Sequence, residues 1–246
     1  MPTQTITSLL DNPIHNALIE VDSQFNLGNE SCAFFDKEMA PFIGLKNWSA
    51  TEQKHILKYA PDDRFWFLLV SAEIDFIEEF DLLFTVPVLQ FVCHQLGAKP
   101  KSKVSAEIVP LNDSHVPEML ALTALTKPGP FTSKTINFGN YHGIFIDGRL
   151  AAMGGERFHV GEFCELSAIC THPDFQGLGL AGQITYFLAE SVFSKGKTPF
   201  LHARIDNVRA IEVYKRLGFE LRKEITFYLF SRKENVLENE SFSDYH

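Results

Sequence analysis

Small residues between Ile169 and Gly182 have the composition of an anion-binding turn. The segment passes from an apolar run into the glycine-containing stretch Gln176-Gly177-Leu178-Gly179-Leu180-Ala181-Gly182, which we expect to open a helix. Glycines allow a backbone to approach a phosphate without a Cβ atom in the way. The first amides of a new helix have no partner within the helix and point at the charge. The stretch therefore predicts a pyrophosphate site.

Two other interpretations of this turn stay open at this point. The glycines could simply close a tight connection between a strand and a helix. Alternatively, Gly177, Gly179 and Gly182 match the dinucleotide-binding fingerprint, and Asp206 lies at a suitable distance to hold a ribose. Against the dinucleotide hypothesis, only about 40 residues follow Asp206, too few for repeated βαβ units, and antiparallel hairpins are expected before the turn.

Two sequence blocks resemble those of the GNAT acetyltransferase superfamily. Gln176 to Ala181 is similar to motif A, Gln/Arg-x-x-Gly-x-Gly/Ala, at every defined position. Asn207 to Phe219 resembles motif B, with an Asn followed by Ala210, Tyr214 and Gly-Phe at fixed offsets. The resemblance extends over about 130 residues, and its C-terminal portion looks most like the FR47-like and glycine N-acyltransferase branch.

The resemblance implies a cofactor and the residues that bind it. Acetyl-CoA, or another acyl-CoA, would be the co-substrate, with its pyrophosphate on the amides of the turn and its pantetheine arm along a strand that splays from its neighbour. Asn207 falls on an asparagine that commonly contacts the cofactor. The predicted cofactor-binding residues are Ile169, Cys170, Thr171, Gln176, Gly177, Leu178, Gly179, Leu180, Ala181, Gly182 and Asn207.

The resemblance also implies how the reaction would be catalysed. An acceptor amine must lose a proton and attack a thioester, and the departing thiolate must be reprotonated. Tyr214 falls on the motif B tyrosine that resembles a general acid, although an aromatic residue packed on an amphipathic helix is the alternative. Glu165 stands four residues before Ile169, the offset of the glutamate base in the family's histone acetyltransferases.

Other residues compete with Glu165 for the role of base. Glu156, His159 or a chain of waters could accept the proton, and an amine that arrives neutral needs no dedicated base. His172 is expected in a loop near the cofactor and His202 within the sheet. Cys170 is not expected to form an acyl intermediate, because a cysteine in an apolar strand has no evident partner to generate a thiolate.

The elements that would position these residues follow from periodicity and turn chemistry. Asp147-Gly148 joins two strands as a tight hairpin, since both positions tolerate positive φ angles. We expect strands at 104–109, 143–146, 149–154, 163–171, 200–203 and 220–230 (the last a strand or a hairpin), and helices at 113–126, 180–194 and 210–217. The predicted fold class is α/β (α+β), with a mixed central sheet of the GNAT type and flanking helices.

The Gly/Pro/Lys stretch from Gly97 to Lys103 is typical of a connection between folded units. We therefore predict an N-terminal domain at 1–102, a catalytic domain at 103–235 and a polar tail at 236–246. The N-terminal half is expected to be a substrate cap, an oligomerisation surface or a degenerate copy of the acyltransferase half. The hypothesis of a degenerate copy rests on a weak sequence similarity between Val88 to Lys101 and residues 214–219.

Composition excludes several functional classes. The chain has 246 residues, 45% of them hydrophobic, and a net charge of −9, which argues against nucleic acid as a partner. It has no apolar run long enough to span a membrane, and we expect a cytoplasmic protein. The four cysteines form no CxxC pair, so neither a zinc site nor a disulfide framework is predicted.

The predicted activity is transfer of an acetyl or short acyl group to a primary amine of a small molecule or peptide, by direct attack in a ternary complex. A non-catalytic acyl-CoA-binding regulatory module is the alternative. Oligomeric state stays open, with a homodimer among the possibilities.

Overall fold

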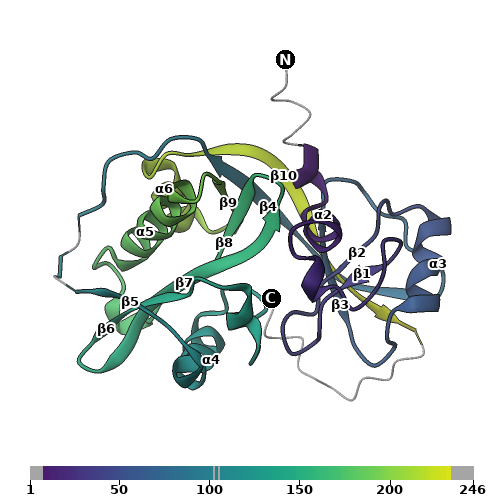
Figure 1. Cartoon of the computed structure of the whole chain (residues 1–246), viewed down its shortest axis with the longest axis horizontal. Helices are drawn as coiled ribbons and strands as arrows, with labels where there is room; N and C mark the ends of the chain where they lie inside the picture. The colour runs from purple at the N-terminus through teal and green to yellow at the C-terminus, as the bar shows by residue number, and fades with distance from the viewer. Residues whose placement is uncertain (1–7, 102, 105, 234–246) are drawn as a thin grey trace.

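The computed structural model describes residues 8–101, 103–104 and 106–233. Its centre is a mixed eight-stranded sheet in the order β3-β10-β4-β9-β8-β7-β6-β5 (Figure 1). The strands are β3 (Trp66–Val70), β4 (Phe80–Cys93), β5 (Ile108–Pro110), β6 (His142–Ile146), β7 (Arg149–Val160), β8 (Phe163–Thr171), β9 (Thr198–Arg204) and β10 (Phe219–Arg232). A separate antiparallel pair consists of β1 (Ala33–Phe34) and β2 (Ile43–Gly44).

Helices cover both faces of the sheet, so the predicted mixed sheet with flanking helices is confirmed. They are α2 (Pro13–Ile19), α3 (Ala50–Tyr59), α4 (Val116–Thr126), α5 (Leu180–Ser194) and α6 (Val208–Arg216). Apolar side chains of α5 and α6 belong to one buried cluster, and those of α2 and α4 belong to the other. Strand β7 lies between the two layers, and nearly all its residues are buried, as expected for a strand covered on both faces.

Local sequence explains the main elements of the C-terminal half. Asp147 and Gly148 have φ angles of 51° and 74°, and they form the tight turn between β6 and β7. Helix α5 presents Leu180, Ile184 and Leu188 on one buried stripe. Its bounds and those of β8 agree with the predicted ranges, whereas the strand predicted at 104–109 begins at Ile108.

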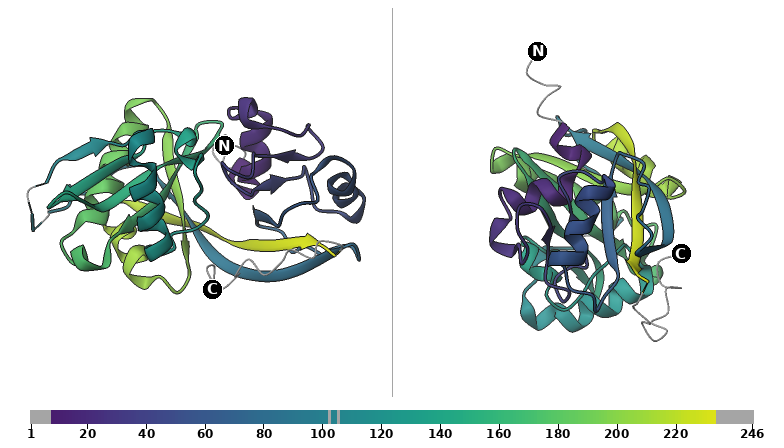
Figure 2. Two further views of the ribbon diagram at one scale, coloured as in Figure 1. Left: turned by 90° about the horizontal axis from the view of Figure 1, so that it is seen from below. Right: turned by 90° about the vertical axis from the view of Figure 1, so that its right-hand side faces the viewer.

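The sheet continues across the predicted boundary at residue 102. Strand β4 lies upstream of it, yet β4 pairs with β9 on one side and with β10 on the other. Figure 2 shows β4 (blue) and β10 (yellow) as two long curved strands that run side by side from the sheet of the downstream half to beneath the N-terminal elements. The segment predicted as a final strand or hairpin is one strand, β10, which pairs with β4 from Phe219 to Arg232. Upstream residues thus complete the sheet of the downstream half.

The N-terminal half does not repeat the architecture of the C-terminal half. The described residues before 102 contribute β3 and β4 to the shared sheet and hold the short β1-β2 pair. No neighbouring strands splay apart within this part of the described chain, which argues against a degenerate copy. The predicted tail at 236–246 lies outside the described residues.

The mixed sheet also decides against dinucleotide binding. Among the described strands, β8 and β9 pair in parallel and every other ladder is antiparallel. A doubly wound fold needs repeated parallel units, so the dinucleotide hypothesis is wrong. No helix in the described part of the chain is long and apolar enough to cross a membrane.

Candidate active site

A split between two parallel strands forms the centre of the candidate site. Strands β8 and β9 pair at three positions, the last of which joins Glu165 to Phe200. Beyond that pair β8 continues to Thr171 and β9 to Arg204 without further pairing between them. The edge of β8 that faces β9 therefore carries backbone groups free to bond a peptide-like molecule laid along it. Ile169, Cys170 and Thr171, the predicted pantetheine-binding residues, lie on this segment.

A bulge in β8 lies within the split. The register against β7 shifts between the pairs Met153–Cys170 and Gly155–Ser167, which leaves one extra residue on β8. Ala168 stands at this position with a φ angle of 54°, a left-handed conformation that is uncommon for a residue with a Cβ atom. A bulge re-aims the backbone groups on either side of it. Here it changes the direction of the strand next to the segment that would bind the cofactor.

The glycine turn follows β8 through a short 3-10 helix, Pro173–Phe175, and leads into α5. Gly177 and Gly179 have φ angles of 77° and 87°, which few other residues adopt. Gly179 caps α5 without any side-chain hydrogen bond, so no side chain occupies the first amides of the helix. A Cβ atom at Gly177 would meet no atom within 4 Å. These features fit the pyrophosphate of CoA.

A basic side chain stands beside this turn. Arg209, in the first turn of α6, donates a hydrogen bond from Nη1 to Oε1 of Gln176 over 3.2 Å. The guanidinium adds positive charge to that of the α5 N-terminus. Gly182, by contrast, has no steric need to be glycine, because a Cβ atom there would make only ordinary contacts with Pro100 and Val213.

Tyr214 lies on α6 and is buried among aromatic side chains. It is 8% exposed, and its ring packs against Phe91 and Phe219 with centroids 6.4 and 6.1 Å away. Burial, together with the nearby thiol of Cys170, raises the pKa of Tyr214 to about 12. The phenol therefore keeps its proton at neutral pH, as a general acid must before it donates. The structure brings Tyr214 close to Cys170, which lies on the splayed part of β8.

Glu165 lies at the root of the split, but it is already fully engaged. It is 1% exposed, and its two oxygens accept hydrogen bonds of 2.7 and 2.6 Å from Nε and Nη2 of Arg157. Burial alone would raise its pKa, but the charge and hydrogen bonds of Arg157, with the hydrogen bond to His202, lower it to about 2. A carboxylate so stabilised is a weak proton acceptor, which argues against Glu165 as the base.

The contacts of His202 fix its tautomer. Gln90 donates through Nε2 to the carbonyl of Leu10 and accepts through Oε1 from Arg222, so its amide orientation is determined. The same Nε2 lies 2.9 Å from Nε2 of His202, which must therefore be the acceptor. The other ring nitrogen, Nδ1, lies 2.6 Å from Oε1 of Glu165 and donates to it. His202 thus bridges Glu165 and Gln90.

Three further predicted residues have structural contacts of their own. Asn207 caps α6 by accepting a hydrogen bond from the amide of Ala210, and its contact with a cofactor stays a prediction. His172 accepts a hydrogen bond from the amide of Asp174, and its ring lies tilted against that of Phe175 at the start of the turn. Burial raises the pKa of the Cys170 thiol to about 12, which agrees with excluding it as a nucleophile.

Sequence reasoning missed Arg157 and Gln90, whose partners lie on other strands. Gln90 is the polar exception in the apolar stretch 88–93, and Arg157 is one of three polar side chains, with Glu156 and His159, in the largely apolar stretch 150–160. A charged or amide side chain in such a stretch has to find a buried partner. That rule flags both residues, although it does not identify the partners. The alternative bases Glu156 and His159 lie together in a separate cluster with Asp22.

Comparisons with known proteins agree with this geometry. Residues 141–228 match the family of FR47-like proteins. A solved structure from Novosphingobium aromaticivorans, described as an acetyltransferase of the GNAT family, is 30% identical with a TM-score of 0.81, over 91% of this chain and 98% of that one. A GCN5-related N-acetyltransferase from Kribbella flavida has the same fold at 14% identity, with a TM-score of 0.63 over 91% and 96% of the two chains. No curated protein matches the sequence.

Proposed function

The chain belongs to the GNAT family of acetyltransferases, which take an acyl group from acyl-CoA, and we propose that it transfers an acetyl or other short acyl group to a primary amine. One observation carries the proposal: the splayed end of β8 leads directly into the uncapped N-terminus of α5, beside Tyr214. A strand edge for pantetheine, a turn for pyrophosphate and a protonated phenol thus lie along one path. This arrangement supports catalysis as well as binding.

We assign the binding roles to backbone groups. The amides of residues 177–182 would hold the pyrophosphate, with Arg209 adding charge beside Gln176. The free edge of β8 at residues 169–171 would hold the pantetheine arm through its N–H and C=O groups. Both roles require a particular backbone conformation more than particular side chains, which is why Gly177, Gly179 and Ala168 matter through their φ angles.

The chemical step proceeds by direct attack in a ternary complex. The amine nitrogen attacks the thioester carbonyl carbon, the new C–N bond forms and the C–S bond breaks. Tyr214 donates its phenolic proton to the departing sulfur and regains a proton from solvent afterwards. The proton lost by the amine goes to water, since both oxygens of Glu165 already accept hydrogen bonds from Arg157.

We assign Glu165 a structural role in place of the predicted role of base. Its carboxylate ties β7, β8 and β9 together through Arg157 and His202 at the last paired position before the split. This fixes where the strands begin to diverge. Glu165 is therefore a positioning residue in this proposal.

A non-catalytic acyl-CoA-binding module is the second candidate, because the turn alone would suffice to bind the cofactor. A phenol at the motif B position, Tyr214, favours an enzyme over such a module, because binding alone needs no proton donor. Small amines, amino acids and peptide N-termini are all suitable acceptors in this proposal, and the measurement below separates them.

Calorimetric titration with acetyl-CoA, free CoA and NAD tests the binding step, and release of free thiol with a panel of amines tests the chemistry. Gly177→Glu places a carboxylate in the phosphate turn. Gly196→Glu is the matched control, because Gly196 also has a positive φ angle, 70°, and open space around it, at the other end of α5. We expect micromolar binding of the CoA species alone, lost only in Gly177→Glu. Binding without thiol release from any amine would favour the non-catalytic module.

A further inference from the structure

Three metal-ligating side chains meet at the end of β8 opposite the phosphate turn. They are Glu156 and His159 of β7 and Cys164 of β8, and their ligand atoms all lie within 4.8 Å of one another. The sequence did not predict this group, because its three residues do not form a CxxC pair or another recognised metal-binding spacing. It is separate from the split and has no part in the proposed transfer of the acyl group.

An irregularity in β7 brings the group together. In a regular strand Glu156 and His159, three residues apart, would point to opposite faces. Between the pairs Glu156–Leu166 and His159–Cys164 the register shifts by one residue. The extra residue turns both side chains to the same side, so that Nε2 of His159 lies 3.3 Å from Oε2 of Glu156. Cys164 is the direct cross-strand partner of His159.

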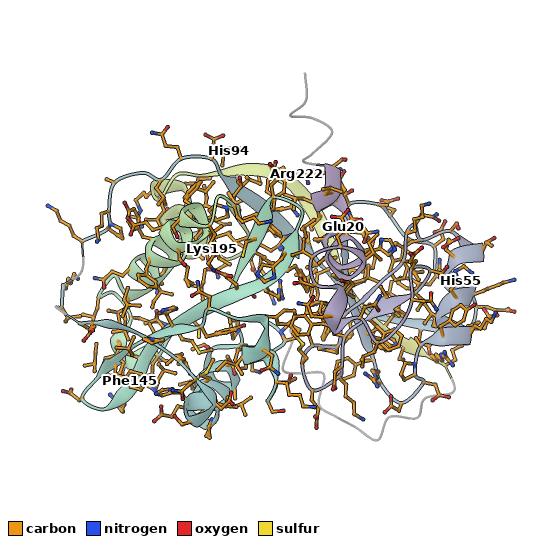
Figure 3. All side chains as sticks on the ribbon, viewed as in Figure 1. Glu20, His55, His94, Phe145, Lys195 and Arg222 are labelled. Carbon is orange, nitrogen blue, oxygen red and sulfur yellow. The ribbon has the colours of Figure 1, made fainter. Side chains whose placement is uncertain are left out.

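Outer contacts orient each ligand. Asp22, which is 2% exposed, lies with Oδ1 2.8 Å from Nδ1 of His159 and accepts the backbone N–H of the same residue through Oδ2. Nδ1 is thereby engaged and Nε2 faces the group. Asn140 and Lys195 both donate to Oε1 of Glu156 over 2.7 Å, which leaves Oε2 on the ligand side. Lys195, which is labelled in Figure 3, directly follows the last residue of α5.

We propose that Glu156, His159 and Cys164 bind a divalent metal ion of the zinc type, with Asp22 as the carboxylate that orients the histidine. Imidazole, thiolate and carboxylate together form a donor set that suits zinc, and a carboxylate on the far histidine nitrogen is the usual outer-shell partner of such a site. Ligand bonds of about 2.0–2.3 Å put tetrahedral ligands roughly 3.5 Å apart. The ligand atoms, all within 4.8 Å of one another, already lie near that spacing.

The surroundings suit a site that an ion can enter from solvent. The side chain of His159 is 22% exposed, whereas Glu156 and Cys164 are buried. Three protein ligands leave a fourth position for water. Asp22 precedes the short 3-10 helix Ser23–Phe25 and bonds to His159. An ion bound to His159 would therefore strengthen the connection of this N-terminal segment to β7 and β8.

The test uses the full chain, reduced and freed of metal with a chelator. Zinc titration against a chromophoric competitor gives stoichiometry and affinity, and cobalt substitution gives a thiolate charge-transfer band if Cys164 is a ligand. We expect one ion per chain, with Cys164→Ser at least roughly 100-fold weaker and lacking the band, and Asp22→Asn about 10- to 100-fold weaker. Cys93→Ser is the matched control, because Cys93 is also a buried thiol but lies outside the group.

Circular dichroism of the metal-free proteins establishes that each variant is folded. If Cys164→Ser does not fold, His159→Gln replaces it, since His159 is partly exposed and its loss should also remove binding. Absence of one-to-one binding in the natural sequence, or equal affinity in the folded ligand variant, would overturn the proposal. The group would then be an ion-pair network only.

Discussion

Nδ1 of His202 lies 2.6 Å from Oε1 of Glu165, at the strand pair where β8 and β9 begin to separate. Arg157 holds both oxygens of the same carboxylate from β7. On the other side, Gln90 and Arg222 continue the chain of hydrogen bonds across β4 and β10 to Asp11. Arg222, labelled in Figure 3, joins Gln90 to Asp11 in this polar line. The split in the sheet thus starts from a buried and fully bonded polar line.

Replacing Glu165 by Gln should destabilise the protein by about 3 kcal/mol at neutral pH, because Arg157 would keep a buried charge without its partner. The pKa of Glu165 falls from an ordinary 4.5 to about 2 on folding. This group therefore stabilises the fold above about pH 4.5, and the contribution of about 3 kcal/mol is lost as pH falls toward 2.

Urea unfolding between pH 2 and 7 measures this effect. The difference between the natural sequence and Glu165→Gln should shrink as pH falls below about 4.5. Glu212→Gln, at an exposed position on α6, is the control and should change little. A general base would instead show as a large loss of kcat with unchanged stability, and that outcome would reverse our assignment of Glu165.

Tyr214→Phe should lower kcat by about 10²- to 10⁴-fold and leave affinity for acyl-CoA nearly unchanged, since only the proton donor is removed. The ring contacts with Phe91 and Phe219 persist, so the fold should be kept. Steady-state kinetics and calorimetry measure the two effects, with Tyr186→Phe on α5 as the control. Unchanged turnover at every pH would exclude Tyr214 as the acid.

Ala168 offers a test of the bulge. Ala168→Gly removes the steric cost of a positive φ angle, whereas Ala168→Val adds a branched side chain to it. We expect Val to lower the unfolding free energy by about 1–3 kcal/mol relative to Gly. We also expect the Val variant to weaken acyl-CoA binding, because the bulge directs the strand edge at residues 169–171. Equal stability and affinity in the two variants would show that this conformation is not required.

A chain that starts at Lys103 should not fold by itself. It would lack β4 and leave the edges of β9 and β10 without the strand that joins them. We expect this fragment to be insoluble or to unfold without a cooperative transition, and co-expression with residues 1–102 to restore a soluble complex. A stable, CoA-binding fragment 103–246 would support the predicted domain boundary instead.

Local chemistry made much of the C-terminal half predictable. The Asp-Gly turn, the apolar stripe of α5 and the glycines at 177 and 179 each depend on neighbours in sequence, and each lies where expected. The start of α5 directly after the glycine turn was likewise expected from the motif. These features need no knowledge of distant partners.

Features that depend on partners distant in sequence could not be predicted. The sequence does not show that Arg157 would take both oxygens of Glu165, because the bulges that align the two residues arise from strand pairing. Nor does it show that β4 would enter the sheet between β9 and β10. The group of Glu156, His159 and Cys164 was missed for the same reason.

The pairing of β4 with β10 also determines when the sheet can be completed during synthesis. Residues 80–93 leave the ribosome well before their partners at 219–232 are made. Until then β4 lacks that neighbour, and closing so long a loop slows the pairing. We therefore expect the nascent chain to complete this sheet only after residues 219–232 have emerged, with β4 the strand most in need of protection from aggregation until that moment.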